Sequence, residues 1–382
     1  MNFKKVIGID AHSIGLKQGG NETYIKELLK AISEIEHSDF KFLIFLSRNI
    51  PIPSFLLKKN FKICRVSKNS FLRFMFELPF KTHINKLDLI HTQYHLPFMI
   101  SCPGIITVHD ISFLRFPEFF PKHLFLKFKI FFPYSIKKSV KIITCSEFSK
   151  KEMINFYKVE PEKIVVIYYG VSENFKPIEI KENILKKYGI KKPFILTVSN
   201  LQPRKNLNRL IKAYFYLLKN KKNFSYSLVI VGRKLWLYKE IFEEAKRLGF
   251  KDRIVFTDYI PEEDLIYLYN LAEVFVYPSL YEGFGLPVLE AMACGCPVIT
   301  SNLSSLPEIC EKAAILVNPY DIEEIANAIN EVISNANLRN FLKKEGLKQS
   351  KKFTWKKTAE EILKVYEKVL YNTKKQKFLI KI

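Results

Sequence analysis

The chain has 382 residues, of which 48% are hydrophobic and 26% charged, with only 13 glycines and 18 prolines. This composition excludes a disordered, collagen-like or mucin-like chain, and the length favours two domains. The formal net charge is +23, from 61 Lys and Arg against 38 Asp and Glu, which suggests an anionic partner: a nucleic acid, an anionic membrane or a phosphorylated small molecule.

Short apolar segments alternate with longer stretches of helical periodicity, which is typical of βαβ units. Seven strands are predicted in the first half, at residues 6–10, 42–46, 61–66, 87–91, 105–109, 142–145 and 164–167. Six are predicted in the second half, at residues 194–199, 228–232, 254–257, 274–277, 297–301 and 315–317. Several are apolar on both faces, as parallel strands covered by helices must be. We therefore predict an α/β protein with two doubly wound sheets.

The alternation pauses at residues 170–177 and in a charged stretch that ends at Lys192. We place the domain boundary there, with a first domain at 1–172 and a second at 173–355. Residues 356–382 have apolar residues at helical spacing and are predicted to form a helix that packs back on the first domain.

The six cysteines are scattered in mostly apolar segments and include no set of four metal ligands. We expect them to be core residues, and we expect neither a metal site nor a cofactor. The apolar run at residues 6–9 is too short for a signal peptide, and no run approaches the ~18 residues of a membrane span. A cytoplasmic location is therefore expected, with any membrane contact made from the surface.

Candidate functional residues follow the predicted strand at 274–277, because open parallel sheets bind ligands beyond the carboxyl ends of their strands. Residues 278–299 read PSLYEGFGLPVLEAMACGCPVI, with Glu282 and Glu290 eight residues apart. A carboxylate accepts paired hydrogen bonds from vicinal hydroxyls such as those of a ribose or hexose. The amides at 284–286 begin a helix and suit an anion. Taken alone, the spacing favours the simpler interpretation, in which Glu282 caps the helix and Glu290 is a solvated side chain.

A second group follows the strand at 194–199, where residues 200–209 read NLQPRKNLNR. Arg204 and Lys205 open a helix there and would suit a diphosphate. In isolation, two basic residues among 61 carry little information.

Four motifs occur in order at strand ends: Pro203-Arg-Lys-Asn, Val231-Gly, Tyr259-Ile-Pro and the segment at 278–295. Together they resemble the group 1 (family 4) nucleotide-sugar glycosyltransferases of GT-B fold, and the last segment matches the family's E-x7-E signature. The resemblance covers the second half and, more loosely, the first. It implies a retaining transferase with two domains facing a central cleft, which binds a nucleotide sugar with the second domain and an acceptor with the first.

The resemblance also implies roles for single residues. Glu290 would hold the ribose hydroxyls and Glu282 the donor sugar or its reacting face, while Arg204 and Lys205 neutralise the diphosphate. Many members carry an arginine six residues before the lysine, where this chain has Ser199. We expect Arg204 to supply that second charge.

Other site residues are implied with less context. The further donor contacts implied in the second domain are Gly232, Ile260, Phe284, Gly285 and Leu286. In the first domain Gly20 belongs to a glycine-containing loop that enters a helix, and His109 follows a strand and would face the donor sugar. His12, His91 and His95 are alternatives to His109, and a strand-end histidine is as often a structural hydrogen-bonding residue.

The implied chemistry needs no metal, because Arg204 and Lys205 would stabilise the departing phosphate and no Asp-x-Asp motif accompanies the site. Retention is explained by front-face attack, with the leaving phosphate accepting the proton of the acceptor. The Pro-Arg-Lys-Asn variety resembles mannosyl- and rhamnosyltransferases of surface polysaccharide assembly. It favours GDP-mannose over UDP-linked hexoses as the donor, with a saccharide or lipid-linked saccharide as the acceptor.

Three other functions are compatible with parts of the sequence. A GT-B epimerase or phosphorylase is disfavoured by the motif context and by the lack of a pyridoxal-phosphate lysine motif. A nucleic-acid-binding protein is suggested by the charge alone, since no zinc finger or RNP motif is found. An inactive scaffold is disfavoured because Glu282, Glu290, Arg204 and Lys205 are all in place.

Two basic, aromatic and acid-free segments lie at residues 51–76 and 121–141. Such segments are typical of proteins that lie on an anionic membrane. A lysine-rich composition with phenylalanines in the core explains them equally well, because the positive charge is general: residues 1–172 carry 26 basic and 14 acidic residues, against 35 and 24 in the rest.

Overall fold

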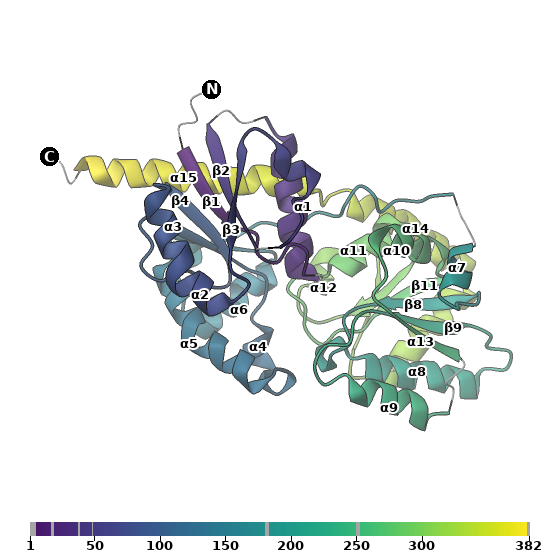
Figure 1. Ribbon diagram of the computed structural model, residues 1–382. Coiled ribbons are helices and arrows are strands. Elements are labelled where there is room, and N and C mark those ends of the chain that lie inside the picture. The colour runs from purple at the N-terminus through teal and green to yellow at the C-terminus, as the bar shows by residue number, and fades with distance from the viewer. Residues whose placement is uncertain are drawn as a thin grey trace. The chain divides into compact units, whose positions relative to one another are not determined.

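The computed structural model describes residues 5–16, 19–36, 39–47, 49–179, 183–249 and 253–379. The chain divides into two compact units, each built on one parallel sheet flanked by helices (Figure 1). Unit 1 comprises Met1–Ile111, His123–Gly170 and Thr354–Ile382, and unit 2 comprises Ser112–Lys122 and Val171–Phe353. The predicted α/β class with two doubly wound sheets is confirmed.

The sheet of unit 1 has the order β3-β2-β1-β4-β5-β6-β7, and every pair is parallel. Its strands are β1 (Lys5–Asp10), β2 (Phe40–Ser47), β3 (Phe61–Val66), β4 (Leu89–Gln93), β5 (Gly104–Val108), β6 (Lys141–Thr144) and β7 (Ile164–Val166). Strands β4 and β5 are buried along their whole length, although β4 includes the polar residues His91, Thr92 and Gln93.

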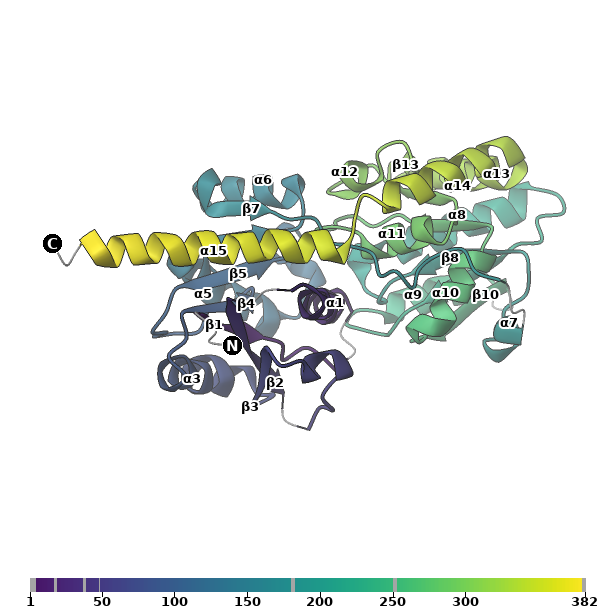
Figure 2. The same ribbon diagram turned by 90° about the horizontal axis from the view of Figure 1, so that it is seen from above.

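The helices of unit 1 include one formed by the last residues of the chain. They are α1 (Gly20–Glu34), α2 (Ser70–Leu72), the π-helical turn η2 (Arg73–Glu77), α3 (Leu78–Ile84), α5 (Lys122–Lys138), α6 (Glu147–Tyr157) and α15 (Trp355–Leu379), with short 3-10 turns η1 (Ser54–Leu57) and η4 (Pro161–Lys163). Figure 2 shows α15 lying along unit 1. The hydroxyl of Tyr366 contacts His91 Nδ1 at 2.6 Å, and the ring of Trp355 stacks on Tyr169.

The sheet of unit 2 has the order β10-β9-β8-β11-β12-β13 and is again parallel. Its strands are β8 (Phe194–Val198), β9 (Ser227–Val231), β10 (Ile254–Asp258), β11 (Val274–Tyr277), β12 (Val298–Ser301) and β13 (Ile315–Val317). Its helices are α4 (Ser112–Arg115), α7 (Asn183–Lys187), α8 (Leu207–Asn220), α9 (Lys239–Arg247), α10 (Glu262–Leu271), α11 (Leu286–Ala293), α12 (Leu306–Cys310), α13 (Ile322–Ser334) and α14 (Ala336–Ser350), with 3-10 turns η3 (Pro117–Phe119) and η5 (Pro203–Lys205).

Helix α8 illustrates why these segments are helical. It buries Leu207, Leu210, Ile211, Tyr214 and Leu217 against the sheet, at the spacing of one helix face. This apolar stripe follows directly on the Arg204-Lys205 turn, so the packing of α8 fixes the position of the two basic residues.

Two expectations need correction. Strand β4 runs from Leu89 to Gln93, two residues beyond the predicted 87–91, because Thr92 and Gln93 pair with Ile106 and Thr107 of β5. Residues 112–122, expected in the first domain, belong to unit 2.

Aromatic contacts hold residues 112–122 in unit 2. The ring of Phe116 contacts Tyr281, with centroids 6.1 Å apart, and the ring of Phe120 contacts Trp236 at 5.7 Å. Trp236 Nε1 also donates to the carbonyl of Phe119.

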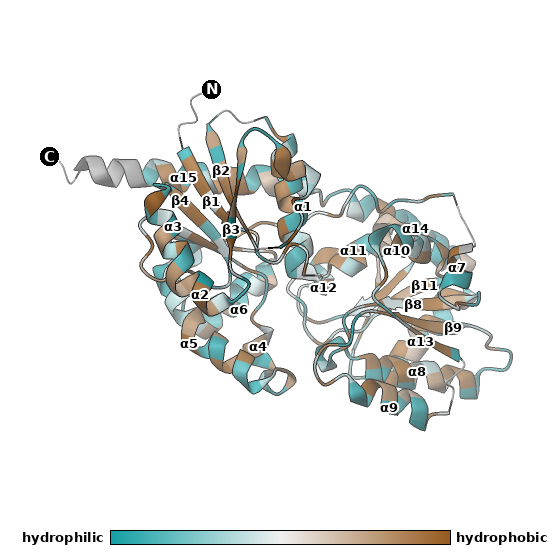
Figure 3. Cartoon of the chain, viewed as in Figure 1, coloured by the Kyte–Doolittle hydropathy of each residue, from teal (hydrophilic) through white to brown (hydrophobic). Residues whose placement is uncertain are grey.

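The six cysteines are all unpaired thiols, four of them buried, as the scattered spacing predicts. Hydropathy along the described helices finds no span that is both long and apolar enough to cross a bilayer (Figure 3).

Candidate functional site

The loops that follow β8 and β11 leave the sheet of unit 2 side by side. β8 pairs with β9 on one side and with β11 on the other, so the strand order reverses between β8 and β11. Ligands of open parallel sheets bind at such a reversal. There the structure brings Lys205 to Glu282, 77 residues further along the chain.

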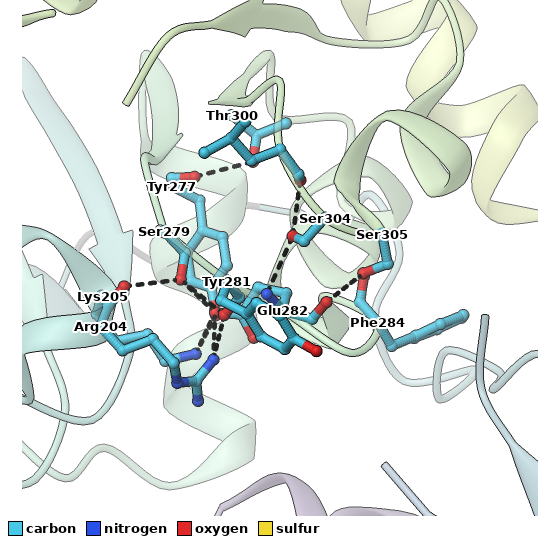
Figure 4. A network of polar contacts seen from close by, with 11 residues as sticks. Arg204, Lys205, Tyr277, Ser279, Tyr281, Glu282, Phe284, Thr300, Ser304 and Ser305 are labelled. Carbon is cyan, nitrogen blue, oxygen red and sulfur yellow. Dashed lines mark hydrogen bonds and ion pairs between the residues drawn. The ribbon is translucent and has the colours of Figure 1, made fainter. Parts of the chain in front are cut away.

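Glu282 is the centre of a buried polar network (Figure 4). Its Oε1 accepts hydrogen bonds from Lys205 Nζ at 2.6 Å, from Ser279 Oγ at 2.5 Å and from Tyr277 Oη at 3.1 Å. Arg204 Nη1 lies 3.2 Å from the same oxygen and donates to the carbonyl of Tyr281. One carboxylate is thus surrounded by two cations and two hydroxyls.

The electrostatics of this network keep Glu282 ionised. Burial alone would raise its pKa, but the charges of Lys205 and Arg204, with hydrogen bonds from Lys205 and Ser279, lower the pKa to about 2. At neutral pH the Glu282 carboxylate is therefore a fixed anion and holds no proton to donate.

The backbone that carries these side chains is shaped by a few residues. Asn206 adopts a left-handed conformation (φ 59°), which asparagine tolerates, and its Nδ2 donates to the carbonyls of Pro278 and Pro319. The hydroxyls of Ser304 and Ser305 bond the backbone of Glu282, Ser304 as acceptor and Ser305 as donor. Asn206 thus ties the loop after β8 to the loops after β11 and β13, and the two serines tie the loop after β11 to the loop after β12.

The start of helix α11 requires a glycine at position 285. Gly285 has φ +109°, and a Cβ there would lie 2.7 Å from the side chain of Leu306. The amides of Gly285 and Leu286 lie in the first turn of α11, where N–H groups have no partner within the helix. Phe284 is buried against Phe353, so its side chain is part of the core.

Glu290 lies on α11 beyond this first turn and is half-buried. Its Oε2 accepts a hydrogen bond of 2.9 Å from the hydroxyl of Tyr269 on α10. Ile260, implied as a residue that lines the base, is buried and follows β10 directly.

Glycine is required at position 232 because neighbouring backbone atoms lie too close for a side chain. A Cβ at this residue would lie 1.8 Å from the carbonyl oxygen of Ser199, because the ends of β8 and β9 approach closely there. Ser199, in the position where the family often has arginine, is 8% exposed.

In unit 1, His109 follows β5 and both of its ring nitrogens have partners. Nδ1 contacts Tyr169 Oη at 2.5 Å, and Nε2 contacts Gln93 Oε1 at 2.7 Å. Because the Gln93 carbonyl oxygen can only accept, Nε2 carries the proton and Nδ1 accepts from Tyr169. Burial lowers the pKa of His109 to about 4, so the imidazole is neutral at pH 7.

The three alternative histidines occupy different surroundings. His91 is buried between Tyr366 and Thr107, with ring nitrogens 2.6 and 2.7 Å from their hydroxyls, which is a structural role. His12 is paired with Asp10 at 3.0 Å. Burial lowers the pKa of both His91 and His95 to about 3.

Gly20 is the first residue of α1, and a Cβ there would meet nothing within 4 Å. Its neighbour Gly19 has φ +82° and is the residue at this turn whose conformation favours glycine. Among the described residues, no group of three or more His, Cys, Asp and Glu side chains is arranged to hold a metal ion.

Comparisons with known proteins agree with this arrangement. Residues 180–349 match the family described as "Glycosyl transferases group 1", and residues 18–175 match "Glycosyltransferase Family 4". The O-antigen chain mannosyltransferase B of Escherichia coli is 33% identical over 278 residues, which is 72% of this chain and 72% of that protein. The chain belongs to the group 1 glycosyltransferases.

One further relative and one solved structure are also similar to this glycosyltransferase. The O-antigen chain mannosyltransferase RfbU of Salmonella typhimurium is 32% identical over 65% of both chains. The solved structure of sucrose-phosphate synthase from Thermosynechococcus elongatus superposes with a TM-score of 0.77 at 21% identity, covering 96% of this chain and all of that one. The fold is therefore GT-B, and the family assignment made from the motifs is confirmed.

Several residues of this glycosyltransferase were not singled out from the sequence. Tyr277 and Ser279 share the carboxylate of Glu282, and Gln93 and Tyr169 fix the tautomer of His109. Ser279 lies in the segment at 278–295 that contains the E-x7-E signature, so the sequence could have identified it as a site residue. Gln93 and Tyr169 carry no local signal, because their contacts with His109 span 16 and 60 residues.

Proposed function

We propose that this glycosyltransferase is a retaining mannosyltransferase, which moves mannose from GDP-mannose to a saccharide or lipid-linked saccharide in surface polysaccharide assembly. We place it at the cytoplasmic face of the cell membrane. Support for mannose comes from the two relatives at 32–33% identity, which are both named as O-antigen chain mannosyltransferases. The observation that best supports a reaction with a nucleotide sugar is the buried cluster of Lys205, Arg204 and Glu282. This cluster lies where the strand order of unit 2 reverses.

The proposed mechanism assigns the leaving group to the cations of this cluster. As the bond between sugar and diphosphate breaks, negative charge grows on the phosphate oxygen, and Lys205 and Arg204 would stabilise it more than the ground state. The Gly285 and Leu286 amides would bind phosphate or sugar oxygens, and Glu290 the ribose hydroxyls.

The proton of the acceptor hydroxyl needs a separate acceptor. Glu282 has a pKa near 2 and already accepts four polar contacts at Oε1, so it is a poor base at neutral pH. In front-face attack the acceptor oxygen bonds to the anomeric carbon on the face from which the diphosphate leaves, so the configuration is retained. The departing phosphate takes the proton of the acceptor hydroxyl. Glu282 would then orient the sugar and hold Lys205 in place. Neutral His109 would have to exchange one of its partners, Tyr169 or Gln93, to form a hydrogen bond with the donor sugar.

A panel of nucleotide sugars tests the proposal. GDP-mannose is expected to raise the unfolding temperature more than GDP-fucose, UDP-glucose or UDP-galactose, because only a bound ligand stabilises the folded state. Mass spectrometry with an oligomannose acceptor should show one added hexose and released GDP. Preference for a UDP sugar would refute the donor assignment, and no turnover of any donor would refute the function.

The site is expected to work without a divalent metal. Arg204 and Lys205 supply positive charge where other transferases use a bound cation, so treatment with EDTA should leave the transfer rate within about twofold. Transfer is measured by nucleoside diphosphate release before and after EDTA. Loss of turnover that Mg²⁺ or Mn²⁺ restores would show that a metal takes part.

Replacing Glu290 should weaken donor binding. Glu290→Gln removes the charge but keeps an acceptor for Tyr269, so the fold should persist. Loss of a charged hydrogen bond to a ribose hydroxyl is expected to raise the Kd of the nucleotide sugar about 10- to 100-fold. Isothermal calorimetry measures this, with Glu331→Gln on α13 as the control. Equal affinity in both variants would remove Glu290 from the donor site.

A further inference from the structure

Unit 1 exposes a group of large apolar side chains on two neighbouring helical segments. We call it the aromatic–lysine face, and its apolar members are 46–65% exposed: Phe71, Leu72, Phe76, Phe80, Ile84, Leu126 and Ile130. Scattered exposed apolar residues need no explanation, but a contiguous group of this size on a monomer marks an interaction site.

The spacing places these residues on one side of each helical segment. Leu72, Phe76, Phe80 and Ile84 follow one another at four-residue intervals through α2, η2 and α3. Leu126 and Ile130 are likewise four residues apart on α5.

Contacts hold the two segments together. Lys127 Nζ of α5 donates to Ser70 Oγ of α2 at 3.1 Å. Phe98 stacks on Tyr134 of α5, and its amide donates to the carbonyl of Phe74. The apolar stripes of both segments therefore belong to one region of unit 1, on the left in Figure 1, where α3, α2 and α5 are labelled.

The charge around these side chains is almost entirely positive. Residues 70–86 contain three basic residues and one acidic residue, and residues 122–138 contain five basic residues and none that is acidic. Arg73 is buried beside Asp10, at 3.8 Å, which leaves seven basic residues against Glu77. Glu77 accepts a hydrogen bond from the amide of Ser67. Lys122, Lys129 and Lys137 are exposed along the same helix as Leu126 and Ile130.

The structure distinguishes phenylalanines that pack in the core from phenylalanines that are exposed, which the sequence alone could not do. Of the phenylalanines at 51–76, Phe61 and Phe74 are buried, whereas Phe71 and Phe76 are exposed. Core packing accounts for the first pair only. Phe80 adds to the exposed group from outside the two segments that the sequence singled out.

We propose that the aromatic–lysine face docks on the surface of an anionic lipid bilayer. Helices that lie in the membrane–water interface insert aromatic and aliphatic side chains among the acyl chains, while their lysines contact the lipid phosphate groups. The aromatic–lysine face has both kinds of side chain. Binding to an acidic protein would explain the lysines. It would not explain why five aromatic and aliphatic side chains of α2, η2 and α3 are exposed. The inference rests on the membrane-face location proposed above and names the surface responsible.

Vesicle flotation tests the inference with the full chain. Vesicles of phosphatidylcholine with about 30% phosphatidylglycerol are expected to bind the protein at least tenfold more tightly than pure phosphatidylcholine, and salt should weaken the binding. Phe76→Ser with Phe80→Ser, and separately Lys129→Glu with Lys137→Glu, should each reduce binding about tenfold. The matched controls in unit 2 are Phe341→Ser, 47% exposed, and Lys343→Glu with Lys344→Glu, which should bind as the parent does.

Any of three results would overturn the inference: the protein does not bind vesicles, it binds neutral and anionic vesicles equally, or the unit 2 control variants lose as much binding as the variants of the aromatic–lysine face. If the Phe76/Phe80 variant instead changes the sedimentation mass, the face joins two copies of this chain. Transfer to a soluble acceptor without vesicles is measured for every variant: turnover without vesicle binding refutes the docking alone, and vesicle binding without turnover of any donor refutes the proposed function alone.

Discussion

Lys205→Ala is expected to lower the transfer rate at least 100- to 1,000-fold, the usual cost of removing one donor that stabilises developing negative charge. The loss should appear in kcat, because the charge on the leaving phosphate grows only as the bond breaks. Lys205 is 9% exposed and reaches the site through contacts with Glu282 and Tyr277, so solvent or a neighbouring side chain cannot easily replace it. Nucleoside diphosphate release under saturating donor measures kcat.

A structural effect has to be separated from this catalytic one. Removing Lys205 leaves the buried Glu282 with Arg204 as its remaining cation, which should cost about 3–5 kcal/mol of stability. The double variant Lys205→Met with Glu282→Gln removes both charges and should recover most of that stability without recovering transfer. Lys212→Ala, a half-exposed lysine on α8, is the control. Transfer by the double variant, or near-normal transfer by Lys205→Ala, would show that the pair is only structural.

The sequence was sufficient to locate the thirteen strands that the described residues form, because most of these strands are buried and largely apolar. It also located the segments that meet in unit 2, since the carboxyl ends of β8 and β11 must lie together once the strand order is known. Strand β4 was misplaced by two residues because Thr92 and Gln93 are polar, although both are buried. Pairing with β5, which is a long-range contact, decides where that strand ends.

The details of the site depend on contacts that a local pattern does not carry. Glu282 was considered as a helix cap, whereas the structure surrounds it with Lys205, Ser279 and Tyr277. The assignment of residues 112–122 to unit 2 depends on Phe116 and its neighbours meeting aromatic rings more than a hundred residues away. Aromatic residues mark a core position but not which core they join.

Unit 1 is expected to lose stability on mild acidification before unit 2 does. All seven histidines of the sequence lie in unit 1, and unit 2 has none. Burial lowers the pKa of His91 and His95 to about 3 and that of His109 to about 4, against an ordinary value of 6.5. In unit 2 the pKa of the Glu282 carboxyl is lowered to about 2, so the stabilisation from this group disappears only as the pH falls below about 4.5.

The sign follows from proton counting. Below about pH 6.5 the unfolded chain binds protons on these imidazoles, whereas folded unit 1 does not until about pH 3–4. The free energy of unfolding therefore falls as the pH falls from 6.5, by up to about 1.4 kcal/mol per pH unit for each histidine. From pH 7 to pH 5 this is roughly 2 kcal/mol per histidine, which is large against a total of 5–15 kcal/mol.

Hydrogen–deuterium exchange at pH 7 and pH 5, corrected for the intrinsic rate, measures both units in one sample. Protection of β4 and β5 should fall by orders of magnitude more than that of β8 and β11, because the histidines lie on or beside the first pair. His91→Gln keeps hydrogen-bonding groups toward Tyr366 and Thr107 but cannot titrate, so it should remove about a third of the pH dependence. The control is His123→Gln, at an exposed residue of α5. Equal loss of protection in the two units, or an unchanged slope in His91→Gln, would show that these imidazoles take up protons without unfolding unit 1.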